Sequence, residues 1–513
     1  MRNWAIDDQL ESADWKGLIQ LDYNSSNANN DNQYTQLLLS LTKTDLEKRL
    51  LVANIRHDRY IVQELRDFCA TANKRMLGVY GLRRTGKSVM LWTVALELMI
   101  HNRNVVFWEL SPEISANELI LLINKLAENP CEYLFIDEAT FVDNFSSWGL
   151  YLYNRFSSMG IHVIVSGTYS YTLKLASADI LYDRIKLLPT TVITYSEYNY
   201  LTGKGIFEFM ESGGILDPVN GAWADYLDTA VVNNVVNSMV RLTSPKYKTL
   251  ANIKSDKVRS LLFYILQEVY LRPILEDLDL EYEYPELEQS LKNLLGRGDS
   301  FDDFEVHKTK IDIYSMLKLE SILIDNKRAM VLLLRDVLLE MELLDFMDIT
   351  TITDAGPVRS REYFITQPGL MYYLALVSRD SVLKNILNNT ELSANIINVV
   401  EGRILENIVF RDTQCKYPNH TVIQLRADGF EIDMVIADLM GNVFLYEIKR
   451  SLKAVNLLTK HLTDARINGF LETLFGNYTL KDSAVIYTGC NTMSSNGTKF
   501  IDVDQFLQSS LDV

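Results

Sequence analysis

The feature that most constrains the fold is the octapeptide GLRRTGKS at residues 81–88. It fits the pattern G-x-x-x-x-G-K-[ST] and lies between a short apolar run and an apolar helical stretch, which is the context of a phosphate-binding loop. The glycines allow a tight turn in which successive backbone N–H groups face an anion. Lys87 would neutralise the β- and γ-phosphates of a nucleotide, and the Ser88 hydroxyl would ligate Mg²⁺. The nucleotide-binding residues predicted in this loop are Gly81, Thr85, Gly86, Lys87 and Ser88.

Short β-rich runs alternate with helical stretches on both sides of this loop. The predicted strands are residues 76–80, 104–110, 133–137 and 161–167. The predicted helices are near residues 87–100, 115–128 and 146–159. Such alternation predicts βαβ units and a parallel sheet with helices on both faces.

A second chemical signal is YLFIDE at residues 133–138, in which four apolar residues precede two carboxylates. Asp137, at the carboxyl end of a predicted strand, is placed to hold Mg²⁺ through water, and Glu138 could polarise the attacking water as a general base. Together with the loop, the pair predicts an ATPase that uses ATP and Mg²⁺. The alternative is a glycine turn followed by an ordinary solvated strand end.

With these motifs in place, the chain resembles a family of bacterial and archaeal AAA-type P-loop ATPases, in the additional-strand branch related to the signalling NTPases. The motifs that carry the resemblance are, in order, GLRRTGKS, YLFIDE, HVIVSGT (162–168), LYDRI (181–185) and TYSEYNYL (194–201). The resemblance extends from about residue 55 to 490, because family members continue into a winged helix and a C-terminal domain of unknown function.

The same resemblance implies further roles in the ATP site. Ser166 or Thr168 would sense the γ-phosphate, with Thr168 the residue assigned to the nucleotide site. Arg184 would act as an arginine finger, which would require a homo-oligomer if it serves a neighbouring subunit. Asp183 stands where the family usually has glycine, and Arg155 is a rival for the finger role. A surface ion pair is the alternative for either arginine.

The sequence predicts an α/β fold of several parts. These are an N-terminal polar extension (1–50), a parallel-sheet P-loop ATPase domain (51–205), a helical region (206–300), a winged-helix-like domain (301–385) and a C-terminal α/β restriction-endonuclease-like domain (390–513). In the winged-helix region, the third helix is predicted at residues 330–344. It carries one basic and three acidic residues, which favours packing or protein contact over DNA reading.

The C-terminal part predicts a helix at 393–413, strands at 421–427, 430–438 and 442–450, a helix at 456–475 and a strand at 483–488. The second and third strands flank the turn-like DLMGN (438–442). If this hairpin centres on Met440, Asp433 faces Glu447 and Glu431 faces Lys449. Opposed carboxylates in a hairpin lie close enough to require a shared cation or proton.

This hairpin resembles the core of PD-(D/E)XK nucleases, with EID (431–433) and EIK (447–449) as its motifs. The resemblance implies metal ligands at Glu406, Asp433 and Glu447, a second divalent metal, and a Lys449 that stabilises charge on a scissile phosphate. The Pro-Asp start of the textual motif is absent, since Ile432 precedes Asp433. The alternative is a structural ion pair in a nuclease-like domain that cuts nothing.

Composition limits the partners. Acidic residues outnumber basic ones 67 to 50, and the resulting formal charge of −17 opposes broad, nonspecific nucleic-acid binding. The four cysteines form no CxxC pair, and no apolar stretch approaches the ~20 residues of a membrane helix. We therefore expect a cytoplasmic protein without membrane contact.

Three functions compete. The first is an ATPase whose nucleotide state regulates a metal-dependent nuclease-like domain acting on DNA. The second is a signalling or scaffold ATPase that uses an inactive nuclease-like domain to bind a protein partner. The third is a nucleic-acid motor, which the overall acidity and the lack of helicase-type motifs disfavour.

Overall fold

The computed structural model describes residues 38–54, 56–72, 74–216, 223–240, 262, 266, 334–376, 390–450, 460–495 and 497–509. Its contacts divide the chain into two compact units. The first comprises residues 1–80, 87–168 and 172–188, and the second comprises residues 81–86, 169–171 and 189–513. Each unit is described by itself.

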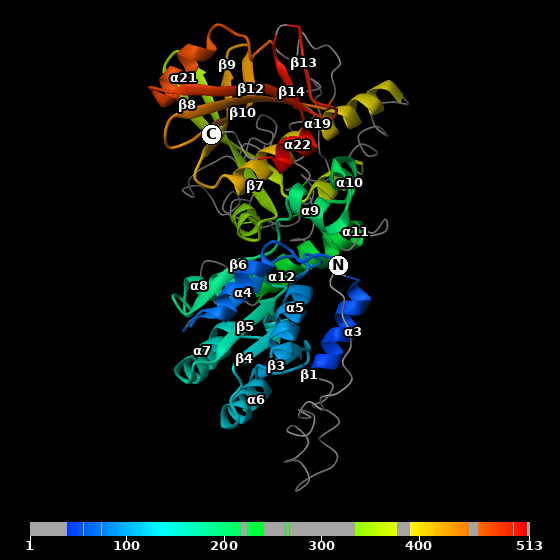
Figure 1. Ribbon diagram of the computed structural model, residues 1–513. Coiled ribbons are helices and arrows are strands. Elements are labelled where there is room, and N and C mark those ends of the chain that lie inside the picture. Colours follow the sequence, from blue (N-terminus) through cyan, green and yellow to red (C-terminus); the bar gives the residue numbers. More distant parts are fainter. Residues whose placement is uncertain are drawn as a thin grey trace, which may run out of the picture. The chain divides into compact units, whose positions relative to one another are not determined.

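The first unit is built on a six-stranded sheet (Figure 1). In spatial order its strands are β1 (Leu38–Ser40), β3 (Val105–Leu110), β4 (Tyr133–Asp137), β5 (His162–Gly167), β2 (Met76–Tyr80) and β6 (Ile185–Pro189). The central strands β3, β4, β5 and β2 run parallel, as predicted, whereas β1 runs antiparallel to β3. The sheet is therefore mixed, because an extra strand from upstream of the predicted domain pairs with its edge.

Helices cover both faces of this sheet, because its central strands bury alternate residues in two different cores. The helices of the unit are α3 (Lys43–Ala53), α4 (Val62–Ala70), α5 (Lys87–Ile100), α6 (Ala116–Glu128), α7 (Phe145–Phe156) and α8 (Ser170–Ala178). On β4, Phe135 points into the core under α3, α4 and α5, while its neighbour Ile136 points into the core under α6, α7 and α8.

The predictions for this part agree closely with the structure. The strands at 76–80 and 133–137 and the helix at 87–100 have the predicted ends, and the other predicted elements differ by a few residues. Both β1 and α3 begin before residue 51, and the segment they form buries Leu41 and Leu46 in the sheet's core. The strand β6 has no counterpart in the prediction. Most of the polar extension lies outside the described residues.

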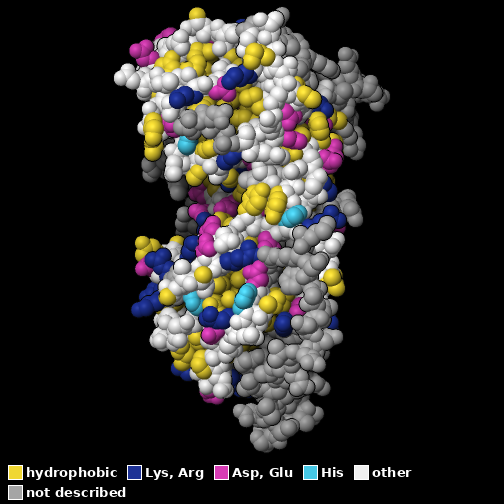
Figure 2. Space-filling model, viewed as in Figure 1, with side chains coloured by type: hydrophobic (Ala, Val, Ile, Leu, Met, Phe, Trp, Pro, Cys, Tyr) yellow, Lys and Arg dark blue, Asp and Glu magenta, His cyan; other side chains and the backbone are white. Residues whose placement is uncertain are grey.

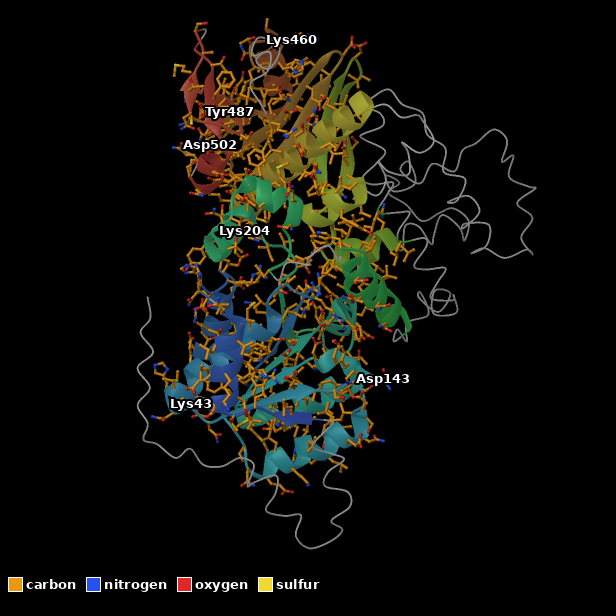
Figure 3. All side chains as sticks on the ribbon, turned by 90° about the vertical axis from the view of Figure 1, so that its right-hand side faces the viewer. Lys43, Asp143, Lys204, Lys460, Tyr487 and Asp502 are labelled. Carbon is orange, nitrogen blue, oxygen red and sulfur yellow. The ribbon has the colours of Figure 1, made fainter. Side chains whose placement is uncertain are left out.

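The second unit contains an eight-stranded sheet in the order β13, β14, β12, β11, β10, β9, β7, β8. Their bounds are β7 (Leu344–Thr353), β8 (Gly356–Ile365), β9 (Thr421–Ala427), β10 (Phe430–Ala437), β11 (Asn442–Lys449), β12 (Thr479–Tyr487), β13 (Thr492–Met493) and β14 (Lys499–Asp502). The strands β9, β10 and β11 form an antiparallel meander, and β12 and β14 continue it in parallel. Figure 3 labels Tyr487 and Asp502, which are partners across β12 and β14.

The helices of the second unit are α9 (Tyr195–Thr202), α10 (Ile206–Ser212), α11 (Trp223–Tyr226), α12 (Asn233–Val240), α19 (Thr390–Lys416), α21 (Ile467–Phe475) and α22 (Val503–Gln508). A π-helical segment, Leu227–Val232, joins α11 to α12. On one face of the sheet, α21 packs Ile467 and Leu471 against Leu445 of β11. On the other face, the adjacent Tyr446 contacts Phe506 of α22, with ring centroids 5.0 Å apart.

The C-terminal prediction is confirmed for β9 and for the hairpin of β10 and β11, within one residue. The helix predicted at 456–475 is observed only from Ile467 to Phe475, residues 460–466 being turns or irregular and 451–459 lying outside the described residues. The strand predicted at 483–488 begins earlier, at Thr479.

The middle of the chain is described only in part, because residues 241–261 and 267–333 lie outside the described residues. Most of the predicted helical region and part of the predicted winged helix fall in these ranges. The helix predicted at 330–344 is observed at residues 334–340 and is followed by a turn with a left-handed Glu342. The hairpin of β7 and β8 then pairs through β7 with β9, so one sheet crosses the predicted boundary between residues 385 and 390. Within the described ranges, no helix is both long and apolar enough to cross a membrane.

Replacing Gly402 with alanine should stabilise the second unit. Gly402 lies inside α19, and a Cβ placed there meets nothing within 4 Å. Alanine lowers the conformational entropy of the unfolded chain, so we expect a gain of about 0.5–1 kcal/mol in the free energy of unfolding, measured by urea denaturation. Gly369→Ala is the contrasting control, since its Cβ would lie 2.3 Å from Trp223 Cζ2 and should destabilise the unit. Equal effects of the two substitutions would contradict this account.

Candidate functional site

The loop at residues 81–86 adopts a fold that only particular residues allow. Gly81 has φ +152°, and a Cβ there would lie 2.2 Å from Thr190 Oγ1. The Thr85 hydroxyl donates to the Leu82 carbonyl over 2.9 Å and lies 3.0 Å from Thr190 Oγ1. The Leu82 N–H donates to Thr191 Oγ1 over 3.3 Å. The turn is thus fixed by its own threonine and by the residues that follow β6.

In the first unit, the predicted carboxylates at the end of β4 are held by the end of β5. Ser166 Oγ donates a short hydrogen bond to Asp137 Oδ1, which also accepts the Glu138 N–H over 3.1 Å. Thr168 donates twice to Glu138, from its hydroxyl over 2.6 Å and from its N–H over 3.1 Å. Glu138 itself has a left-handed backbone, with φ 57°. The parallel pairing of β4 with β5 therefore brings these four residues together.

The environment of Glu138 suits a group that accepts a proton. Burial raises the pKa of the Glu138 carboxyl, the nearby Asp137 raises it further, and Lys87 and the Thr168 hydrogen bonds act in the opposite direction. Lys87 is buried at the start of α5. A carboxyl whose pKa is moved toward neutrality is better matched to proton transfer at neutral pH.

The predicted Mg²⁺ ligands, Ser88 and Asp137, offer oxygen atoms of the kind that bind this ion. Asp137 is 2% exposed, and the hydrogen bonds described above use its Oδ1. Ser88, in the first turn of α5, supplies a hydroxyl oxygen. Hydroxyl and carboxylate oxygens are ligands that Mg²⁺ prefers.

The two candidate finger arginines differ in their surroundings. Arg184 donates to the Ile180 carbonyl over 2.9 Å, and its guanidinium lies 5.9 Å from the Tyr153 ring centroid. Arg155 is exposed at the end of α7. Asp183, before Arg184, has φ 59° and pairs with Arg75. This left-handed backbone explains why glycine suits that position, and why aspartate is tolerated there.

In the second unit, the hairpin of β10 and β11 has the predicted register. Val435 pairs with Leu445 and Ala437 with Val443, which centres the turn on Met440. The turn is closed by backbone hydrogen bonds from Asp438 and Gly441, as the DLMGN sequence predicts. The carboxylates of β10 and β11 therefore meet across the two strands.

The side chain of Lys449 lies between these carboxylates. Its Nζ is 2.6 Å from Asp433 Oδ2 and 3.0 Å from Glu447 Oε2. Asp433 Oδ2 also accepts the Ile448 N–H over 2.7 Å. His461 Nδ1 lies 3.5 Å from Glu447 Oε1, an atom that is buried and accepts no hydrogen bond. The proposed partner of Lys449, Glu431, instead accepts a hydrogen bond from Gln424 over 2.6 Å.

The cluster carries more negative charge than its one lysine neutralises. Burial and the Asp433 charge raise the pKa of Glu447 to about 9. The same two causes raise the pKa of Glu406, on α19, to about 8. Burial alone would lower the pKa of Lys449, but Asp433, Glu447 and Glu406 together raise it above its usual range. The structure thus brings all four predicted residues into one electrostatic cluster.

Among the described residues, however, no group of three or more histidine, cysteine, aspartate or glutamate side chains is arranged to hold a metal ion. Lys449 occupies the space between Asp433 and Glu447 that a shared cation would need. The buried, unpaired Glu447 Oε1 is the observation that favours a cation.

Sequence reasoning missed two groups near this cluster. His461 gave no signal, because no sequence pattern links it to Glu447, fourteen residues earlier. Arg426 and Arg403 both contact the buried Glu362 of β8, at 3.4 Å and 3.1 Å. That contact joins three distant segments, so no local pattern could have revealed it.

The comparisons with known proteins concern the first of these sites. A family of AAA domains matches residues 73–199, a span that includes the loop and both carboxylates at the end of β4. Residues 73–199 form an AAA-type P-loop ATPase domain. None of the curated proteins matches the sequence.

Solved structures similar to the chain are distant from it. DnaA from Aquifex aeolicus with bound AMPPCP is 15% identical, with 55% of this chain and 86% of that chain covered and a TM-score of 0.23. The Orc1 protein of Aeropyrum pernix in complex with DNA is 12% identical, with 64% and 95% covered and a TM-score of 0.22. The S. cerevisiae Hsp104–ADP complex is 12% identical, with 74% and 47% covered and a TM-score of 0.25. At such TM-scores, these similarities decide nothing about substrate or assembly.

Figure 2 shows the charged side chains on one face of the chain. On the face drawn in Figure 2, basic and acidic side chains are interspersed, and no single broad field of either sign covers the described surface there.

The raised pKa of Glu447 makes stability depend on pH. Its pKa is about 9 in the folded chain and 4.5 for the ordinary group, so its contribution is fully present below pH 4.5 and is lost as pH rises toward 9. Glu447→Gln cannot ionise, so the variant should gain stability relative to wild type as pH rises through this window. Calorimetric melting in EDTA measures the difference, with the exposed Glu472→Gln as control. A difference that stays constant with pH would refute the assignment.

Proposed function

We propose that this chain binds and hydrolyses ATP through its AAA domain, and that the nucleotide state regulates a metal-dependent, nuclease-like site in the second unit that acts on DNA. The observation that carries the ATPase proposal is the half-buried Glu138, held by two hydrogen bonds from Thr168 with Lys87 close by. This is the arrangement that a general base and a γ-phosphate sensor require.

The residues of the AAA domain divide the chemistry among them. The loop N–H groups and Lys87 bind the phosphates, and Ser88 and Asp137 would hold Mg²⁺, which supplies positive charge to the transferring phosphoryl group. Glu138 accepts a proton from the attacking water. Because Thr168 binds both Glu138 oxygens, it orients the base and can register the presence of the γ-phosphate through the same contact.

The proposal for the second unit rests on the cluster of Asp433, Glu447, Lys449 and Glu406. A bound cation would stabilise the Glu406 and Glu447 carboxylates, whose pKa values are both raised, and the hydrogen-bond capacity of Glu447 Oε1 is unused. With a divalent metal on Asp433 and Glu447, Lys449 would be released from its ion pairs. It could then neutralise charge that develops on a phosphodiester.

A second function is favoured by a different observation. Lys449 already pairs with both Asp433 and Glu447 and lies between them, so these two carboxylates have a cationic partner without any metal. In that case the second unit is a nuclease-like module that has lost cleavage and binds a protein partner under control of the AAA domain. Under either function, an arginine finger that Arg184 or Arg155 supplied to a neighbouring subunit would require a homo-oligomer.

Replacing Glu138 with glutamine should separate ATP binding from hydrolysis. The amide keeps the shape of the side chain but cannot take a proton, so we expect hydrolysis to fall by about 100-fold or more while ATP affinity stays near wild type. Phosphate release and nucleotide titration measure the two quantities. Lys87→Ala is the companion variant and should lose binding itself. A Glu138→Gln variant that turns over faster than wild type would overturn the role given to Glu138.

Lys449→Ala distinguishes the two functions of the second unit. Plasmid and linear DNA are incubated with wild type, Lys449→Ala and the exposed Lys481→Ala, with Mg²⁺ or Mn²⁺ and with or without ATP. A nuclease predicts cleavage by wild type and Lys481→Ala, and loss of at least about 100-fold in Lys449→Ala.

A metal titration that does not measure activity distinguishes the same two functions, the nuclease and the partner-binding module. If Asp433 and Glu447 bind Mn²⁺, the metal should raise the melting temperature of wild type and not that of Asp433→Asn. No cleavage and no metal-dependent stabilisation, with ATP hydrolysis intact, would reject the nuclease and leave the partner-binding function.

A further inference from the structure

Two successive carbonyls of the phosphate-binding loop are held from outside the loop. The Leu216 N–H donates to the Arg84 carbonyl over 2.9 Å, and the Tyr226 hydroxyl donates to the Arg83 carbonyl over 3.4 Å. Both donors belong to the segment that follows α10, more than 120 residues away in sequence. None of the loop, carboxylate or arginine predictions includes this segment.

Tyr226 is in turn held by Gln367. The Gln367 Nε2 donates to the Tyr226 hydroxyl over 2.8 Å and to the Gly214 carbonyl over 3.3 Å. Tyr226 and Gln367 are 1% and 0% exposed. Since the tyrosine oxygen accepts from Gln367, its proton is directed toward Arg83. Burial also raises the pKa of Tyr226, so the hydroxyl keeps this proton at any physiological pH.

Gln367 is fixed in this position by close backbone contact. The Gly369 N–H donates to the Gly213 carbonyl over 3.1 Å. Gly214 has φ +93°, and a Cβ there would lie 2.7 Å from Gln367 Cβ. Only glycine allows these two segments to approach so closely. The donor that holds Tyr226 is therefore part of a rigid contact that includes the start of helical residues 368–376.

The geometry of the peptide unit gives these bonds a consequence for the loop. In a trans peptide, the C=O of one residue and the N–H of the next point in opposite directions. Holding the Arg83 and Arg84 carbonyls outward therefore turns the N–H groups of Arg84 and Thr85 inward. Arg84 has φ 64°, a left-handed conformation that costs a non-glycine residue about 1 kcal/mol, so it persists only when its surroundings hold it.

We propose that Tyr226 and Gln367 are positioning residues for the nucleotide: they fix the outer carbonyls of the phosphate-binding loop so that its N–H groups face the phosphates. The inference rests on the proposed binding of ATP to this loop. It adds a residue pair from outside the loop, and it connects the loop backbone to the chain that follows β8.

The test compares conservative variants that remove the polar group of one residue while keeping its approximate size. Tyr226→Phe removes the hydroxyl and with it the bonds to Arg83 and Gln367. Gln367→Met removes the amide donor that bonds both Tyr226 and Gly214. Tyr198→Phe is the matched control, because its buried hydroxyl contacts Ser212 Oγ and not the loop. For each full-length variant, AMPPCP affinity is measured by calorimetric titration, KM and kcat for ATP by phosphate release, and the melting temperature without nucleotide.

We expect Tyr226→Phe and Gln367→Met each to weaken AMPPCP binding and raise KM by about three- to tenfold, with kcat within about twofold of wild type. The variants leave Lys87 and Glu138 unchanged, so we expect their effect on nucleotide binding rather than on the chemical step. In the double variant, the two effects should not add, because both act through one hydroxyl. Tyr198→Phe should match wild type in AMPPCP affinity and KM.

Failure of this inference can be distinguished from failure of the proposed ATP binding. If Lys87→Ala still binds AMPPCP, ATP binding to the loop is refuted and the inference falls with it. If Lys87→Ala loses binding while Tyr226→Phe and Gln367→Met keep wild-type affinity and KM, only the inference is overturned. A fall in melting temperature with unchanged affinity, or additive effects in the double variant, would likewise reduce the pair to a structural contact and overturn it.

Discussion

Charge that is buried must be neutralised or hydrogen-bonded, and both candidate sites of this chain are organised around that requirement. In the AAA domain, Asp137 and Glu138 lie side by side at the end of β4, and Ser166 and Thr168 from β5 and the residue after it supply the donors that keep them in place. Lys87 adds the positive charge. Under the proposed function, the same groups would bind the phosphates and the metal of the nucleotide.

The second unit meets the same requirement differently. Its cluster places Asp433, Glu447 and Glu406 around one lysine, and the raised pKa values of the two glutamates report the charge that remains uncompensated. A divalent cation and a proton are competing ways to remove that charge. Which of them the protein uses separates a nuclease from a partner-binding module, and the competition follows from the same three carboxylates.

The conformation of the loop at residues 81–86 depends on distant parts of the chain. Its glycines and Thr85 shape the turn from within, while Thr191, Leu216 and Tyr226 hold its backbone from outside. The outer contacts all come from chain that follows β6. The loop backbone is therefore joined by hydrogen bonds to the chain that follows β6, whichever function the C-terminal cluster performs.

The sequence by itself determined the elements whose signals are local. The strand ending at Asp137, the helix beginning at Lys87 and the hairpin centred on Met440 could be predicted because alternating apolar residues, a glycine-bounded turn and a two-residue spacing of charges act within a few residues. The predicted meeting of Asp433 with Glu447 follows from that register alone. The placement of the carboxylates at a strand end likewise needed only the pattern of one strand.

Tertiary structure decided the rest, because the contacts join residues far apart in sequence. The antiparallel β1, the pairing of β7 with β9 and the hydrogen bonds from Tyr226 and Gln367 have no local pattern that could reveal them. Lys449 was predicted to face Glu431, but its flexible side chain reaches the more negative pair beside it. Strand register fixes where a Cβ lies, whereas the balance of buried charge decides where a long side chain ends.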